Sequence, residues 1–295
     1  YYDFQTPVTP ADLSAYKADE IAEELPMSEK ELGKGQNYLV TLVEVDENKQ
    51  KIARKKIQIQ TKVNDEIREY GLMRAANSKH CAKAIKAYTY KAPGWGSKWL
   101  YIDMEWLPGA TLHDHLTKHK KRPNEPQMAQ ITRDVITGLQ ELHGLGYVHR
   151  DLRPENIFLV GENLNNIERA VVTNYGRACP IGDTKAADVG CFPVHAPETF
   201  GYYIYREYAK ANFPYGGGTV WPETLSMTPG KENSSQIAHD LQRFDTWRQS
   251  FRSRQAIDVF SLGRTLQWFI YGDGNKKPKE QVSDAMHDFV YHCTQ

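Results

Sequence analysis

The chain has 295 residues, with 37 Lys and Arg against 37 Asp and Glu, so its formal net charge is zero. A balanced charge gives no general attraction to nucleic acid or to an anionic membrane surface, and we expect no nucleic-acid partner. The sequence holds no apolar run long enough to span a bilayer. A hydrophobic content of 40% is ordinary for a globular protein, and four scattered cysteines exclude a disulfide framework.

The predicted elements begin with a polar segment, residues 1–31, which is punctuated by prolines and leans toward helix. Two strands follow at 38–45 and 52–59, because runs rich in β-branched residues flank a polar turn there. In the second strand Ala53 and Lys55 share one face, since strand side chains alternate. This part of the chain is therefore expected to form a sheet.

Helical patterns become frequent further along the chain. Residues 63–76 predict a helix even though Gly71 is unfavourable inside one, and strands are expected at 100–106 and 170–173. Residues 257–271 are apolar nearly all round and predict a buried helix. One long run shows apolar residues stepping by three and four, the stripe of an amphipathic helix packed on a core: Met128, Ile131, Val135, Leu139 and Leu142.

The most informative stretch is residues 146–156, which read Gly-Tyr-Val-His-Arg-Asp-Leu-Arg-Pro-Glu-Asn. It resembles the catalytic loop of eukaryotic protein kinases, in which an Asp lies near the substrate hydroxyl and an Asn five residues later holds a metal. The resemblance implies that Asp151 is the catalytic carboxylate and that Asn156 is a metal ligand. It also places Arg153 in the catalytic group.

Further motifs in the family's order extend this resemblance over about residues 30–295. Residues 33–40 resemble the glycine-rich loop over the ATP phosphates, where glycines let backbone N–H groups approach phosphate oxygens. Residues 52–55 resemble the strand motif that supplies a phosphate-binding Lys. Residues 196–198, Ala-Pro-Glu, resemble the end of the activation segment. Residues 258–263 resemble the start of the large-lobe central helix, whose first Asp would brace the catalytic loop or simply cap the helix.

The resemblance implies an α+β, bilobed protein-kinase-like fold, with a small β-rich N-lobe and a larger helical C-lobe. We expect an N-terminal extension over 1–31, the N-lobe over 32–107 and the C-lobe over 108–295. The C-lobe would carry an insertion at 199–257, because the segment after the Ala-Pro-Glu motif is far longer than the family norm.

The nucleotide pocket implied by the resemblance draws on several elements. Lys55 would contact the α- and β-phosphates, with Lys56 as the competing choice. Glu69 would pair with that Lys, with Glu66 as the runner-up. The ring of Phe158 would lie beneath the adenine and either stack or crowd it. The residues expected to bind the nucleotide, gatekeeper and hinge included, are Gly33, Gly35, Val40, Ala53, Lys55, Met104, Glu105, Leu107 and Phe158.

Several positions depart from the family pattern. Asn174 stands where the family has the metal-binding Asp, and its neutral amide removes one charge from the site that it would form with Asn156. Tyr38 occupies the third glycine position of the phosphate loop, where its ring would clash with phosphates or fold inward. Arg153 replaces the usual Lys, a mild change. Cys191 replaces a Thr that would hydrogen-bond the catalytic Asp, and a thiol is a poorer partner.

These departures leave two functions open. Asn174 and Tyr38 favour a pseudokinase, a kinase fold that serves as a binding or allosteric scaffold. The retained Lys55, Glu69 and Asp151 favour the alternative, an active Ser/Thr protein kinase with atypical use of ATP and Mg²⁺. ATP and Mg²⁺ are the expected cofactors if the pocket is open, and none is expected if it is closed.

The insertion at 199–257 is rich in Tyr and Trp, which are favoured interface anchors, so a protein partner is expected there. A cap packed on the large lobe is the equal alternative. The insertion, the N-terminal extension and the decayed metal motif together resemble the secreted rhoptry kinases and pseudokinases of apicomplexan parasites. Localisation is expected to be cytoplasmic by default, or secreted if this narrower resemblance holds. Thr184 is the candidate for activation-loop phosphorylation.

Overall fold

The computed structural model describes residues 9–35, 38–45, 50–59, 63–94, 96–183, 255–271 and 282–294, and the structural statements below concern these residues. Several features expected from the sequence lie outside them: Thr184, Cys191, the Ala196-Pro197-Glu198 motif and residues 199–254 of the insertion.

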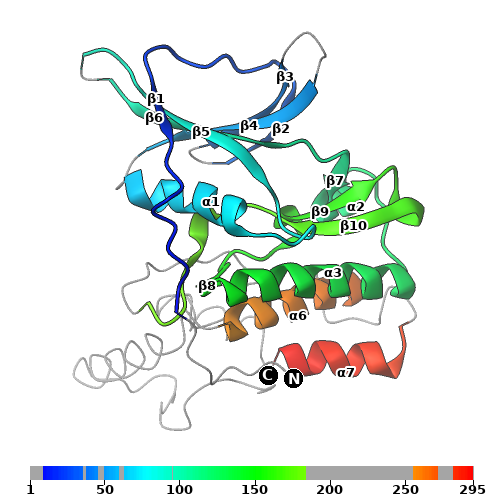
Figure 1. Cartoon of the computed structure of the whole chain (residues 1–295). Coiled ribbons are helices and arrows are strands. Elements are labelled where there is room, and N and C mark those ends of the chain that lie inside the picture. Colours follow the sequence, from blue (N-terminus) through cyan, green and yellow to red (C-terminus); the bar gives the residue numbers. More distant parts are fainter. Residues whose placement is uncertain are drawn as a thin grey trace, which may run out of the picture.

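A six-stranded sheet forms the first half of the described chain (Figure 1), and its strand order is β1-β5-β6-β4-β3-β2. Strand β1 pairs with β5 in parallel, and the other neighbours are antiparallel. The helix α1, Val63–Ala75, lies beneath the sheet in Figure 1. The strands are β1 (Asp19–Ile21), β2 (Glu31–Lys34), β3 (Tyr38–Val45), β4 (Gln50–Gln58), β5 (Ala84–Lys91) and β6 (Lys98–Glu105).

Strand β4 is buried on both faces, which is unusual for a polar sequence. Ala53 and Lys55 point to one face, and Ile52 and Arg54 point to the other. The buried Arg54 is neutralised by Asp103 of β6, because its guanidinium donates to both carboxylate oxygens at 2.6 and 2.8 Å. This paired arrangement lets β4 run through the centre of the sheet and present Lys55 to the pocket described below.

Helices dominate the second half. The long helix α3, Glu125–Gly144, starts with a capping box in which Asn124 and Gln127 satisfy each other's backbone N–H groups. Its predicted apolar stripe is buried. Helices α6 (Ala256–Tyr271) and α7 (Asp284–Cys293) lie below α3 in Figure 1. Among the described helices, none combines the length and apolarity needed to cross a bilayer.

Short elements connect the two halves and surround the site. A three-stranded sheet has the order β10-β9-β7, and a two-stranded one pairs β11 with β8. These strands are β7 (Gly109–Thr111), β8 (Tyr147–Val148), β9 (Ile157–Gly161), β10 (Ile167–Val172) and β11 (Cys179–Pro180). The short helices are α2 (Leu112–Thr117), η1 (Pro154–Asn156), η2 (Leu164–Asn166) and η3 (Tyr175–Arg177).

The expected α+β, bilobed architecture is confirmed, with the sheet in one half and the long helices in the other. The helical leaning predicted for residues 1–31 is wrong for the described part, residues 9–31. That part holds β1 and the start of β2. The physical reason is a tertiary contact. Residues 19–21 pair with the edge strand β5, and its backbone hydrogen-bond partners favour a strand over the helix suggested by the local sequence.

Candidate functional site

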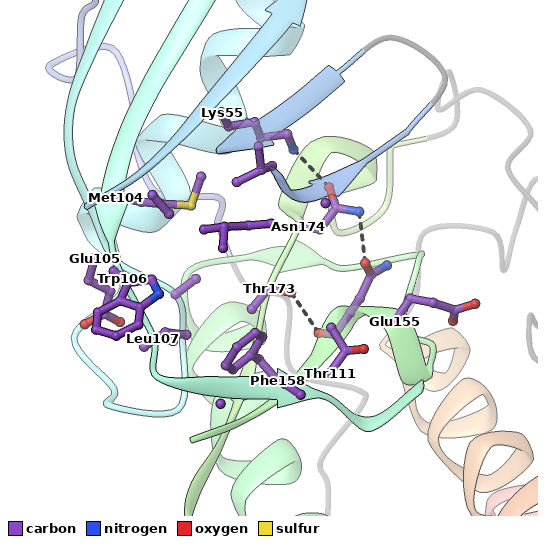
Figure 2. A pocket seen from close by; sticks show the side chains of 18 of the residues that line it. Lys55, Met104, Glu105, Trp106, Leu107, Thr111, Glu155, Phe158, Thr173 and Asn174 are labelled. Atoms are coloured by element: carbon purple, nitrogen blue, oxygen red, sulfur yellow. Dashed lines mark hydrogen bonds between the residues drawn. The ribbon is translucent and has the colours of Figure 1, made fainter. Parts of the chain in front are cut away.

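A pocket opens between the six-stranded sheet and the β10-β9-β7 sheet (Figure 2). Val40 and Ala53 line it from β3 and β4, and Phe158 lines it from β9 on the other side. Met104 and Leu107 close the end where β6 leaves the sheet. Apolar walls on two opposite sides suit a flat aromatic ligand.

All but one of the residues expected to bind a nucleotide line this pocket. The set is Gly33, Val40, Ala53, Lys55, Met104, Glu105, Leu107 and Phe158, and it is joined by Glu69, Asn156 and Asn174. The exception is Gly35, which lies against the ring of Tyr38. Burial raises the pKa of Glu105 at the hinge end.

Sequence reasoning missed several lining residues, among them Thr111, Asp114, Glu155 and Thr173. Two of these could have been found, because Glu155 and Thr173 each precede a motif residue. Thr111 and Asp114 follow the Pro-Gly break after the hinge, where the chain turns back under the pocket as β7 and α2. No local pattern signals that return.

Lys55 and Glu69 form a buried ion pair at the inner end of the pocket. Nζ of Lys55 lies 2.8 Å from both carboxylate oxygens of Glu69. The two residues are only 5% and 2% exposed, so water screens the pair little. Glu69 is carried by α1, and the pair therefore fixes α1 to strand β4.

A chain of hydrogen bonds leads from this ion pair to Asn156 and Asp151. Lys55 Nζ also donates to Oδ1 of Asn174 at 3.1 Å. Nδ2 of Asn174 donates to Oδ1 of Asn156 at 3.0 Å, and Nδ2 of Asn156 donates to Oδ2 of Asp151 at 3.0 Å. Figure 2 shows the bonds that Asn174 makes to either side. The two residues expected to hold metal are thus bonded to each other.

The backbone at Asn174 is in the left-handed region, with φ 64° and ψ 71°. Asn is one of the few residues with a side chain that adopts this region readily. The next residue, Tyr175, is buried and its hydroxyl donates to the carbonyl of Val172 at 2.8 Å. Together these features turn the amide of Asn174 toward Lys55.

Asp258 of α6 braces the loop that carries Asp151. It is fully buried and accepts the backbone N–H of His149 at 2.8 Å and that of Arg150 at 2.9 Å. Nε2 of His143, on α3, lies 2.8 Å from the same carboxylate. Burial acts to raise the pKa of Asp258, but the hydrogen bonds from His143 and His149 outweigh it and hold the pKa below its ordinary value.

The imidazole of His149 adds a second brace. Its Nδ1 accepts the backbone N–H of Asp151 at 3.1 Å, so the proton sits on Nε2, which donates to the carbonyl of Thr173 at 2.9 Å. This ring therefore ties the loop before Asn156 to the segment before Asn174. Asp151 and Asn174 are held in one rigid unit.

The ring of Tyr38 covers the ammonium of Lys55. Nζ lies 4.4 Å from the ring centroid, within the range of a cation–π contact. The ring also packs against Gly35, where an added Cβ would lie 2.3 Å from Cε1 of Tyr38. The inward-folded alternative is therefore the one adopted. Gly35 leaves space for a tyrosine ring in this loop.

Arg153 points to Glu155. Its Nε and Nη2 lie 2.9 and 2.8 Å from the two carboxylate oxygens of Glu155, a bidentate pair. Arg177, from η3, instead brings a cation to Asp151, with Nε 3.9 Å from Oδ2. The positive charge of Arg153 is thus compensated by an acid at the mouth of the pocket.

The residues present do not fit the magnesium site expected from the sequence. Mg²⁺ prefers charged oxygen ligands, and the candidate set offers two neutral amides with one carboxylate: Asn156, Asn174 and Asp151. Both amide oxygens already accept hydrogen bonds, from Asn174 and from Lys55 respectively. The set therefore lacks the charge that the ion requires, and hydrogen bonds within the protein already orient both amide oxygens.

Residues 27–295 match the sequence profile of the family described as "Protein kinase domain". The chain is similar to Serine/threonine-protein kinase cst-1 of Caenorhabditis briggsae and of Caenorhabditis elegans. Each is 30% identical over 135 residues, which is 46% of this chain and 25% of the relative. It is also similar to Eukaryotic translation initiation factor 2-alpha kinase 1 of Plasmodium falciparum, 34% identical over 95 residues, or 32% of this chain and 6% of that protein. The matched region thus spans a quarter or less of these relatives.

Proposed function

The chain belongs to the protein kinase family, and we propose that it is a pseudokinase domain. Such a domain uses the kinase fold as a binding or allosteric scaffold, with little or no phosphoryl transfer. The observation that carries the proposal is Asn174, which stands where the family's motif has an Asp and whose amide is bonded to Lys55 and Asn156.

The energetic reason is electrostatic. Phosphoryl transfer depends almost entirely on positioning and on stabilisation of charge, and metal ions supply much of that stabilisation. Loss of one electrostatic group from a preorganised site typically lowers turnover by about 10²–10³-fold. Replacing a carboxylate by the amide of Asn174 removes a full negative charge from the metal's ligands, so a loss of at least this size is expected.

The position of Tyr38 supports the same proposal. In the family this strand region leaves space over Lys55 for phosphates, and here a phenol ring lies 4.4 Å from the ammonium. A triphosphate would have to displace that ring before reaching Lys55. The apolar part of the pocket, between Ala53 and Phe158, is unaffected by this change. We therefore propose that an adenine-like ring can bind while the phosphate end is obstructed.

One observation favours the second candidate, an active Ser/Thr protein kinase with atypical ATP and metal use. The Lys55–Glu69 ion pair is formed at 2.8 Å, and Asp151 is held by its loop beside the pocket. These are groups that an active enzyme needs in place. The preserved Lys55–Glu69 pair and Asp151 are equally consistent with a scaffold that keeps the arrangement of an active kinase domain without its activity.

We further propose that a protein partner contacts the segment 199–257. Aromatic residues are strongly favoured as anchors in protein interfaces, and long insertions in a rigid scaffold often carry binding function. The segment is rich in them: Tyr202, Tyr203, Tyr205, Tyr208, Tyr215, Trp221 and Trp247. Deleting residues 199–254, which leaves all of α6 in place, would abolish partner capture without removing the pocket.

The test is a phosphate-transfer assay with labelled ATP and either Mg²⁺ or Mn²⁺, following both autophosphorylation and a mixture of generic peptide substrates. Asp151→Ala is the matched blank, because it removes the proposed catalytic carboxylate. The proposal predicts that the wild-type chain is no faster than Asp151→Ala with either metal. Turnover that is clearly above this blank would establish the active-kinase alternative.

A further inference from the structure

The segment before the kinase-like sheet is a strap that joins the two halves of the molecule. Residues 9–26 run from the start of β8 past α1 to the sheet, and Figure 1 shows this blue segment crossing beside α1. We propose that these residues, called the N-terminal strap below, are a positioning element that holds α1 where Glu69 meets Lys55. The role holds whether or not the pocket transfers phosphate.

The strap is anchored first on the helical half. The backbone N–H of Ala11 donates to the carbonyl of Leu145 at 2.8 Å, and the hydroxyl of Tyr147 donates to the carbonyl of Ala11 at 3.2 Å. Gly146 has φ 82°, and a Cβ added to it would lie only 2.5 Å from Cα of Pro10, so the strap can approach this closely only because residue 146 is glycine. Backbone of the strap therefore packs directly on backbone at the end of α3.

The second anchor is on α1. Leu13 packs against Gly71, where an added Cβ would lie only 3.1 Å from Cβ of Leu13. A glycine inside a helix costs about 1 kcal/mol relative to alanine. The close approach of Leu13 gives this otherwise unfavourable residue a physical reason, because a side chain at 71 would crowd Leu13.

The third anchor is the sheet. Strand β1 pairs with the edge strand β5, from Asp19↔Tyr88 to Ile21↔Tyr90. Beyond it, Glu24 pairs with Lys56 and accepts a hydrogen bond from the hydroxyl of Tyr101 at 3.1 Å. The carbonyl of Pro26 accepts from Nη1 of the buried Arg54 at 3.1 Å. The strap thus ends on the same strand, β4, that carries Lys55.

These anchors clamp α1 between two contacts. Glu69 and Gly71 are two residues apart, which places them about 200° apart around a helix. One side of α1 therefore meets Lys55 through Glu69, and the other side meets Leu13 through Gly71. Releasing the strap removes the support opposite the ion pair, so α1 gains freedom to move away from β4.

The proposal is tested with Leu13→Ala, which removes the Cγ and Cδ atoms that pack beside Gly71 and leaves β1 intact. Amide hydrogen exchange in α1 is expected to become about tenfold faster, while exchange in α3 stays unchanged. Lys55, now less firmly paired, is expected to be acylated several-fold faster by an amine-reactive reagent, relative to the exposed Lys34. Leu13→Met should restore both values, since methionine fills a similar volume. Val45→Ala, a truncation of an exposed residue of β3, is the matched control and should change neither.

A cross-link gives an independent measurement that does not depend on weakening the protein. In Leu13→Cys/Gly71→Cys the two Cβ atoms would start 3.1 Å apart, so the strap need move outward by only a few tenths of an ångström to reach disulfide distance. The oxidised form should protect α1 amides and Lys55 at least as well as the wild type, and reduction should reverse this. The inference is overturned if Leu13→Ala lowers global stability yet leaves both α1 exchange and Lys55 labelling at the Val45→Ala values.

Discussion

Lys55 and Asn174 are joined by a hydrogen bond of 3.1 Å from the ammonium to the amide oxygen. The same ammonium is paired with Glu69, so one positive charge already balances one negative charge at this point. A carboxylate at 174 would place a further negative charge between those of Glu69 and Asp151. Lys55 could not neutralise all three, so a bound cation would be needed. The amide of Asn174 is neutral. Its lack of charge suits the metal-free protein and also makes it a poor metal ligand.

This relationship makes the inner end of the pocket a closed polar network. Every step from Glu69 to Asp151 is a hydrogen bond between a donor and an acceptor of the protein itself. Buried networks of this kind are stabilising only when each member is satisfied. Each of these four bonds is made without an ion, which is the property expected of a scaffold that keeps its shape in the absence of a metal.

Gly35→Ala is predicted to expel the ring of Tyr38 from its place over Lys55. The new Cβ would lie 2.3 Å from Cε1 of Tyr38, a distance that the two atoms cannot share. Removing a cation–π contact of about 1 kcal/mol frees the ammonium and should tighten metal-free ATP binding about fivefold. Isothermal titration measures this, with adenosine as the control ligand, because adenosine has no phosphate and should not respond. An unchanged affinity for ATP would show that the ring does not obstruct the phosphate end.

Glu69→Gln is predicted to destabilise the fold by about 3 kcal/mol. It leaves the charge of Lys55 buried without its counter-ion, and breaking a buried pair typically costs about 3–5 kcal/mol. The lower end is expected, because Asn174 and the Tyr38 ring still contact the ammonium. Urea unfolding measures the change.

The control for this prediction is Glu31→Gln. Glu31 pairs with Lys34 at 3.9 Å on the surface, with side chains 47% and 72% exposed. Exposed pairs contribute roughly 0–1 kcal/mol, so this variant should be within about 0.5 kcal/mol of the wild type. Equal effects of the two substitutions would contradict the assignment of a structural ion pair to Lys55 and Glu69.

The sequence predicted those elements whose patterns are local. The strand at 38–45 has the bounds expected, and the helix predicted over 63–76 is found at Val63–Ala75. The apolar stripe of α3 is buried as expected. These successes follow from side-chain periodicity, which depends only on neighbours along the chain.

The sequence could not predict the features that depend on distant partners. Strand β1 has only three residues, and its sequence has no strand pattern of its own. It forms because its backbone pairs with β5. Asn156 and Asn174 were both expected to face a metal, and no local pattern shows that they hydrogen-bond each other. Tyr38 had two possible orientations, and the choice between them depends on the space beside Gly35.

The acid stability of the protein is predicted to depend on Asp258. Its pKa in the folded state is lower than the ordinary value of 3.8, despite burial, owing to hydrogen bonds from His143 and His149. A depressed folded-state pKa contributes stability above pH 3.8 that is lost as the pH falls through the lower, folded-state value. Stability supplied by the charged form is therefore complete near neutrality and disappears in acid.

Asp258→Asn checks this dependence. The variant keeps one acceptor oxygen in place of the two that now serve His143, His149 and Arg150, and we expect it to be about 2–3 kcal/mol less stable than the wild type at pH 7. The difference should begin to shrink as the pH falls below about 4, where the unfolded wild-type chain takes up a proton at Asp258, and should level off below the lower folded-state pKa. Urea unfolding of both proteins between pH 7 and pH 2.5 gives the difference at each pH. A gap that stays constant over this range would show that the charge of Asp258 does not stabilise the catalytic loop.

Asn174→Asp is predicted to create a dependence on Mg²⁺ that the wild type lacks. Without metal, the new carboxylate adds negative charge close to Glu69 and Asp151, so the variant should be about 1 kcal/mol less stable than the wild type. With millimolar Mg²⁺ and ADP the same carboxylate becomes a charged ligand, and binding of the ion to the folded state should raise the melting temperature. Thermal unfolding in EDTA and in Mg²⁺ measures both effects. Asn174→Ala is the matched control, because it removes the amide without adding charge and should show no response to the ion. A wild-type chain that gains as much from Mg²⁺ as Asn174→Asp would mean that the amide already serves as a metal ligand, and the proposal of a pseudokinase would lose its main support.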